Sequence, residues 1–210
     1  LARLEQASIE LAREASVEGR PLFVPQDEAC AWAWLPLGAR DTFTVPAIPS
    51  SATGAESGIR FAFGAPGAGV AGFRWTHQQA LGAQAVALAA GPSGQRLTSF
   101  AEVAPLALMA SSGELLRAWV HETLGPLATD DDHHARLRDT LRVFLQENGS
   151  FKATAERLIL HKNSVQYRIH KAEEALGHPV DQRRLDLELA LLASHWLGAT
   201  VPQHPDQPRP

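Results

Sequence analysis

The chain has 210 residues, of which 45% are hydrophobic and 20% charged, and its formal net charge is −4. These values are ordinary for a globular protein and exclude a broadly basic nucleic-acid coat. The single cysteine, Cys30, excludes a disulfide framework and a cysteine-based zinc site and fits a reducing compartment, so we expect a cytoplasmic protein. Apolar stretches are too short to span a bilayer, and we expect no secretory signal, because no basic n-region and apolar h-region opens the sequence. Because the sequence begins with Leu1, we expect a fragment or a processed product.

The first half of the chain alternates between helical and strand patterns. The predicted elements are a helix at 1–15, two strands within 21–37 around a turn at 25–28, a loop at 38–58, a strand at 59–63, a glycine-rich turn at 64–72, a helix at 73–90 and a strand at 95–100. Helices and strands mixed in this order predict an α+β domain.

The second half of the chain is helical throughout. The predicted helices cover 112–124, 132–146, 151–159, about 162–176 and 181–197, and a proline-rich flexible tail follows at 199–210. We therefore expect an N-terminal helix or linker at 1–18, an α+β domain at 19–110, an all-α domain at 111–198 and the tail.

Two of these helices, within Ser150–Gly177, are spaced as in a helix-turn-helix. Ser150 is a good N-cap, and Ala155 is small enough for a second helix to cross closely. One face of the second helix is apolar, with Val165, Ile169, Ala172 and Leu176. The turn has Ile159 where glycine is usual, and two helices joined by a tight turn can be merely a packing unit.

Charge distinguishes this segment from the rest of an acidic chain. Five lysines and arginines lie between Ser150 and Ala172, against a single acid, Glu156. A helix fits the major groove and presents its first turns to base edges. We expect base contacts from His161, Lys162, Asn163, Gln166 and His170. We expect phosphate contacts, which fix register without specifying sequence, from Lys152, Thr154, Ser164, Tyr167 and Arg168.

The run LRDTLRVFLQENGSFKATAERLILHKNSVQYRIHKAEEALG, followed by RLDLELALL, resembles the C-terminal helix-turn-helix domain of PucR/CdaR-type regulators. The family's hallmark string reads His161-Lys162-Asn163-Ser164-Val165-Gln166-Tyr167-Arg168 here, with Lys162 and Ser164 where arginine and threonine are usual. Upstream, FVPQDEACAWAWLPLG, IRFAFGAPGAGVAGFRWTHQQALGAQAVALA and LTSFAEVAPLALM resemble the degenerate GGDEF-like domain of these regulators.

The resemblance implies a sequence-specific transcriptional regulator whose partner is double-stranded DNA. It implies a homo-oligomer, dimeric or larger, and a small-molecule effector acting through an upstream or N-terminal domain. It implies no enzyme activity, catalytic residue, cofactor, metal or membrane partner. A nucleotide cyclase of this fold needs a Gly-Gly-(Asp/Glu)-Glu-Phe turn, which the sequence lacks, and between Arg40 and Arg74 its only acids are Asp41 and Glu56.

Other patterns remain open as alternatives. The run Asp130–His134 could hold a metal, although an acidic helix start explains it better, because adjacent helical residues point about 100° apart. The glycines at 64–72 could form a phosphate loop, but their spacing matches no such motif. His77, Gln78 and Gln79 could line a ligand pocket. Retained cyclase-like chemistry, or a helical domain that docks on a protein, are the alternative functions.

Overall fold

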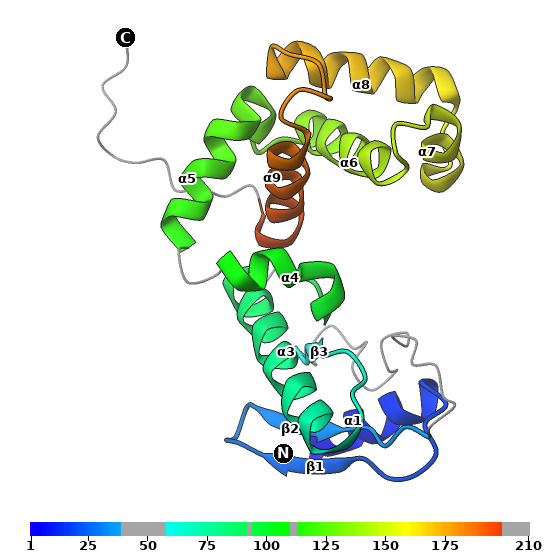
Figure 1. Cartoon of the computed structure of the whole chain (residues 1–210), viewed down its shortest axis with the longest axis vertical. Helices are drawn as coiled ribbons and strands as arrows, with labels where there is room; N and C mark the ends of the chain where they lie inside the picture. The colour runs from blue at the N-terminus through cyan, green and yellow to red at the C-terminus, as the bar shows by residue number, and fades with distance from the viewer. Residues whose placement is uncertain (39–57, 92–93, 110–112, 199–210) are drawn as a thin grey trace. The chain divides into compact units, whose positions relative to one another are not determined.

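The computed structural model describes residues 1–38, 58–91, 94–109 and 113–198 (Figure 1). The chain divides into two compact units, the first made of Leu1–Ala87 with Gln95–Ala104 and the second of Leu88–Gly94 with Pro105–Pro210. The predicted domain boundary near residue 110, the tail at 199–210 and all but the ends of the predicted loop at 38–58 lie outside the described residues. No helix in the described part is long and apolar enough to cross a membrane.

The first unit combines helices with two short two-stranded sheets. Its elements are α1 (Ala2–Glu14), β1 (Leu22–Pro25), β2 (Ala31–Trp34), β3 (Phe61–Phe63), α3 (Gly69–Ala89), β4 (Leu97–Ser99) and the start of α4 (Phe100–Met109). β1 and β2 pair antiparallel, whereas β3 and β4 pair parallel. The described residues of this unit thus contain both helices and strands, and the strands lie within a few residues of their predicted positions.

The β1–β2 hairpin is closed by a side chain in its turn. Oδ1 of Asp27 accepts hydrogen bonds from the backbone N–H groups of Ala29 and Cys30, each at 2.7 Å. The indole of Trp34 then stacks on Phe73 of α3, with ring centroids 4.6 Å apart. The rings of Trp32 and His77 form a T-shaped pair with centroids 4.7 Å apart. His77, one of the alternative ligand residues, therefore packs against the aromatic face of this hairpin.

Helix α3 begins at Gly69, four residues earlier than predicted. The glycine-rich stretch before it was predicted to be a turn, but only part of it is one. A Cβ on Gly67 would lie 2.7 Å from the Cα of Gly72, so the backbone passes too close to itself for any side chain there. Gly69 has a φ of +64°, which glycine adopts without a steric cost. These glycines serve both the close approach and the helix start.

Helix α4 was not predicted from the sequence. The predicted strand at 95–100 ends at Ser99, and Phe100 already belongs to the helix. Pro105 lies inside α4, and proline is unusual in a helix interior because it lacks the N–H and clashes with the preceding turn. Burial stabilises the segment, since Val103 and Leu106 are almost completely inaccessible to solvent.

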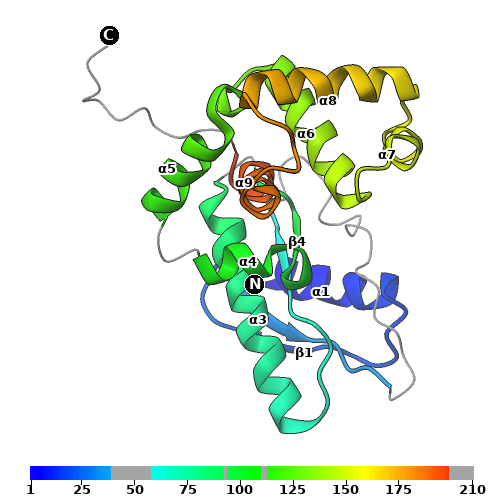
Figure 2. The same ribbon diagram turned by 45° about the horizontal axis from the view of Figure 1, so that its top comes forward.

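The second unit is all-helical in its described residues, as predicted. Its main elements are α5 (Gly113–Leu124), a 3-10 turn at Gly125–Ala128, α6 (Asp132–Gln146), α7 (Phe151–Leu158), α8 (Lys162–Leu176) and α9 (Arg184–Leu197). α9 packs against both α5 and α6, and Figure 2 shows it between them. α9 begins three residues later than predicted, because Arg183 adopts a left-handed conformation with a φ of 56°.

Candidate DNA-binding surface

Helix α7 is fixed at its start by a side-chain cap. Oγ of Ser150 accepts a hydrogen bond from the backbone N–H of Ala153 at 3.2 Å, which satisfies one of the free donors at the helix start. Ala155 is buried where α7 meets its neighbours, and α7 packs against both α6 and α8. Nη1 of Arg157 contacts Oε1 of Glu147 at 2.8 Å, so an ion pair also links α7 to the end of α6.

Helix α8 has one buried and one exposed face. Val165, Ile169 and Ala172 are at most 4% exposed, which confirms the face that periodicity predicted, and Leu176 is half-buried at its end. α8 packs against α6 and α7 through this face. Burial of these side chains fixes the rotation of α8 about its axis, and therefore decides which polar residues face solvent.

The exposed face of α8 carries most of the predicted base contacts. His161, Lys162, Asn163 and Gln166 are all exposed within the N-terminal cap and first two turns. Ser164 and Tyr167, predicted to contact phosphate, are exposed on the same segment. His170 is also exposed, but its Nε2 lies 3.2 Å from a carboxylate oxygen of Glu174. The structure thus brings together four of the five predicted base-contacting side chains at one helix end.

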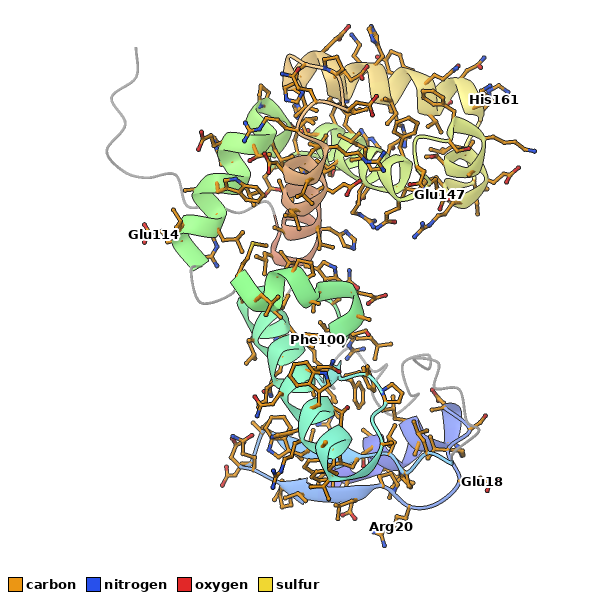
Figure 3. All side chains as sticks on the ribbon, in the orientation of Figure 1. Glu18, Arg20, Phe100, Glu114, Glu147 and His161 are labelled. Carbon is orange, nitrogen blue, oxygen red and sulfur yellow. The ribbon has the colours of Figure 1, made fainter. Side chains whose placement is uncertain are left out.

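His161 caps α8 through its ring. Its Nδ1 accepts a hydrogen bond from the backbone N–H of Asn163 at 3.2 Å, and its carbonyl accepts from Ser164 and Val165. Because Nδ1 is the acceptor, the neutral ring carries its proton on Nε2. Figure 3 labels His161 at the end of α8 where the exposed polar side chains begin. The ring therefore stabilises the helix start and offers one N–H donor to a ligand.

Thr154 is wrongly placed among the predicted phosphate contacts. Its relative exposure is 0%, and its hydroxyl donates to the backbone carbonyl of Ser150 at 2.8 Å. Its backbone N–H donates to the same carbonyl at 2.9 Å. A threonine within a helix often bonds the carbonyl four residues earlier in this way, which removes its hydroxyl from the surface. Thr154 is a packing residue of α7.

Arg168 is turned toward the protein and not toward solvent. It is half-buried, and its Nη1 donates to Oγ1 of Thr140 on α6 at 3.2 Å. Thr140 is itself 1% exposed and donates to the carbonyl of Arg136 at 2.7 Å. This bond ties α8 to α6. A phosphate contact from Arg168, as predicted, would need the guanidinium to use its remaining donors or to leave Thr140.

Charge is distributed unevenly along α8. Toward its C-terminal end the Glu174 carboxylate pairs with Lys171 at 2.5 Å and lies near His170, and the bond with Lys171 lowers the pKa of Glu174. Lys162, at the other end, has no ion pair within 4 Å among the described residues. On α7, the exposed Nζ of Lys152 lies 3.9 Å from Glu156. Among the described residues, the cations of α8 without a carboxylate partner are therefore Lys162, exposed at its N-terminal end, and Arg168, half-buried against Thr140.

The acidic run before α6 acts as a helix cap. Oδ1 of Asp131 accepts from the backbone N–H of His134 at 2.8 Å, and its Oδ2 lies 2.7 Å from Nδ1 of the same residue. The backbone hydrogen bond is the main reason why the pKa of Asp131 lies below its usual range. Among the described residues, no group of three or more potential ligands is arranged to hold a metal ion.

Together, α7, the three-residue turn at 159–161 and α8 form a helix-turn-helix whose second helix has an exposed polar face. This motif defines a class of domains that bind duplex DNA by placing the second helix in the major groove. Residues 137–193, from within α6 to within α9, match the family model described as the PucR C-terminal helix-turn-helix domain. The chain thus carries a PucR-type helix-turn-helix domain, as the sequence motifs implied.

Several curated proteins are similar to this chain. An uncharacterized protein in the pkwA 5' region of Thermomonospora curvata is 35% identical over 115 residues, which are 55% of this chain and 63% of that protein. The purine catabolism regulatory protein of Bacillus subtilis is 35% identical over 78 residues, 37% of this chain and 15% of the relative. The transcriptional activator PmfR of Paenarthrobacter nicotinovorans is 30% identical over 94 residues, 45% of this chain and 19% of the relative. The chain therefore spans less than two thirds of each of these relatives.

Proposed function

We propose that this chain is the C-terminal portion of a PucR-like transcriptional regulator that reads the major groove of duplex DNA with α8. One observation carries the proposal: the N-terminal end of α8 exposes Lys162, Asn163 and Gln166, while the opposite face of the same helix is buried. Lysine donates to guanine, and asparagine and glutamine pair with adenine through a donor and an acceptor. Two of the similar proteins are named as regulators of transcription or catabolism, which supports the same function.

The proposal is tested by DNA binding at two salt concentrations. The purified chain is titrated against fluorescent duplexes from the upstream region of its own gene and against scrambled duplexes of the same composition. We expect tight binding to the natural sequence that weakens steeply with salt, because phosphate neutralisation releases counterions. Binding that does not distinguish the two sequences, or no binding at low salt even by a cross-linked dimer, would contradict the proposal.

The proposed regulator acts as a homo-oligomer, dimeric or larger. A single helix-turn-helix buries little surface on DNA, and operators that bind such domains are often two-fold symmetric. Residues 1–15 or the remainder of the first unit would supply the contacts between copies. Light scattering of the purified chain, alone and with DNA carrying one or two half-sites, measures the stoichiometry directly.

We propose that the first unit has a regulatory role. We also propose that the protein is a cytoplasmic binding protein rather than an enzyme. Motifs in residues 19–110 resemble the degenerate GGDEF-like domain of PucR-type regulators, in which the signature turn of the active cyclases is absent. A small-molecule effector would act through this unit or through a domain upstream of it. Titration of the chain with nucleoside triphosphates tests for retained nucleotide binding, which would contradict this assignment.

A further inference from the structure

The turn between α7 and α8 depends on one residue in a left-handed conformation. Ile159 has φ 55° and ψ 47°. This conformation allows the backbone N–H of Leu160 to donate to the carbonyl of Ala155 at 2.9 Å, which ends α7 and directs the chain into α8. Glycine is the usual residue for this position, because it has no Cβ to meet the neighbouring carbonyl.

Isoleucine is among the least suitable residues for a left-handed backbone, and its side chain is not buried in a way that would offset the strain. It is β-branched, so the left-handed region is disfavoured by its Cβ substituents as well as by its Cβ. Its relative exposure is 92%, the largest among the exposed large hydrophobic residues of the described chain. Within the described structure, the Ile159 side chain thus adds strain without adding packing, which points to a role in binding.

The surroundings of Ile159 indicate which partner it meets. It lies two residues before His161 and three before Lys162, and is therefore continuous with the proposed DNA-binding surface. The exposed residues nearest to it in sequence, Glu156, Arg157 and His161, are all polar, so Ile159 is a single exposed apolar side chain within a polar stretch of the chain. DNA offers isolated apolar groups next to charged ones: the C5 methyl of thymine in the major groove, and the carbons of deoxyribose.

We propose that Ile159 makes an apolar contact with bound DNA, at a thymine methyl or a deoxyribose, and so contributes to affinity beyond the polar contacts of α8. The inference rests on the proposed function, because it requires that α8 bind duplex DNA. It assigns to the turn a contact of its own and explains why a strained isoleucine stands where glycine would form the same turn.

The test separates strain from contact by measuring stability and DNA affinity on the full chain. Ile159→Gly is expected to raise the melting temperature by roughly 2–5 °C, because strain is relieved, and to weaken binding to the natural upstream DNA by on the order of tenfold. The slope of affinity against salt should stay unchanged, because no charge is lost. Asn148→Gly is the matched control, since Asn148 is also left-handed (φ 51°) and lies before α7; it should leave affinity unchanged.

A second pair of variants excludes an effect of glycine flexibility. Leucine and asparagine have nearly the same shape, but only leucine retains apolar contact. Ile159→Leu should bind within about twofold of the wild type, whereas Ile159→Asn should lose as much affinity as Ile159→Gly. Duplexes in which single thymines are replaced by uracil lack one methyl group each. If one replacement weakens the wild type but not Ile159→Asn, the contact is to that methyl, and if none does, it is to deoxyribose.

The inference is overturned if Ile159→Gly and Ile159→Asn both bind the natural DNA as tightly as the wild type. That result leaves the proposed function intact, because the wild type still binds. If the wild type itself does not distinguish natural from scrambled DNA, the proposed function fails, and the Ile159 contact with it. A loss with Ile159→Leu as large as with Ile159→Asn would also overturn the apolar contact.

Discussion

Replacing Lys162 with alanine tests the proposed DNA-binding surface. Lys162 is the first residue of α8, is exposed, and has no ion pair within 4 Å among the described residues, so its removal breaks no such contact there. A cation at the positive end of a helix is unfavourable by about 0.3–1 kcal/mol, and alanine is the best helix former. We therefore expect the free energy of unfolding of Lys162→Ala to be unchanged or slightly raised.

The expected loss of DNA affinity follows from the base contact that is predicted for Lys162. A side chain that reads a base edge contributes about 1–3 kcal/mol of discrimination, which corresponds to a loss of roughly 5- to 150-fold on the natural site. Scrambled DNA offers only its phosphates to the same charge, so binding there should fall less. The ratio of the two affinities, the specificity, is therefore expected to decrease, and Gln166→Ala should behave in the same way.

Lys152→Ala is the matched control for charge. Lys152 lies on α7 with its side chain 84% exposed and a carboxylate 3.9 Å away, and it was predicted to contact phosphate. This variant should weaken binding to natural and scrambled DNA alike and lower the salt slope by about 1. If Lys162→Ala produced this same pattern, Lys162 would be a phosphate contact. If Lys162→Ala and Gln166→Ala both left affinity for natural DNA untouched, α8 would not be the reading helix.

Three further variants test the supporting structure. Ser150→Ala should lower the free energy of unfolding by about 1 kcal/mol in chemical denaturation, because the cap of α7 is lost; an unchanged value would contradict that role. Thr154→Val should cost about 1 kcal/mol with DNA affinity unchanged, whereas reduced affinity at intact stability would revive the phosphate contact. His195, 3.7 Å away, is the main cause that lowers the pKa of Asp139 below its usual range. The ionised carboxylate therefore stabilises the fold at pH values above its unfolded-state pKa. This stabilisation is lost as the pH falls through the lower pKa of the folded state. In Asp139→Asn, the melting temperature should therefore decrease less as the pH is lowered below about 4. A pH dependence equal to that of the wild type would contradict this role of Asp139.

Periodicity predicted the part of the site that depends on burial. A helix that packs on one side must place apolar residues three and four apart, and Val165, Ile169 and Ala172 do so in sequence and in structure. The remaining residues of α8, which do not belong to this apolar face, were therefore predicted to be exposed. The same logic located Ser150, because a helix start needs an acceptor for its free N–H groups and serine supplies one.

Residue type alone does not reveal which polar side chains have partners inside the protein. Thr154 and Arg168 are hydrogen-bonding residues, and sequence reasoning assigned them to phosphate. Thr154 instead bonds the carbonyl of Ser150, and Arg168 bonds Thr140 on another helix. The partner of Arg168 lies 28 residues away, so no local pattern could reveal it. Helix α4 was missed for a related reason, because long-range burial of Val103 and Leu106 outweighs the local effect of Pro105.

The direction in which α8 meets DNA follows from how its charges are compensated. At the C-terminal end, Glu173 accepts from the backbone N–H of Val180, and Glu174 holds Lys171 and lies near His170. Acids at this end would repel phosphate, and pairing of Lys171 raises its pKa while it uses that charge within the protein. At the N-terminal end, the helix dipole is positive, Lys162 is unpaired among the described residues, and the His161 ring has an N–H to donate. Among the described residues of α8, its N-terminal end combines exposed donors with an unpaired lysine. We therefore predict that α8 enters the groove with its N-terminal turns foremost, and that His170 lies farthest from the bases.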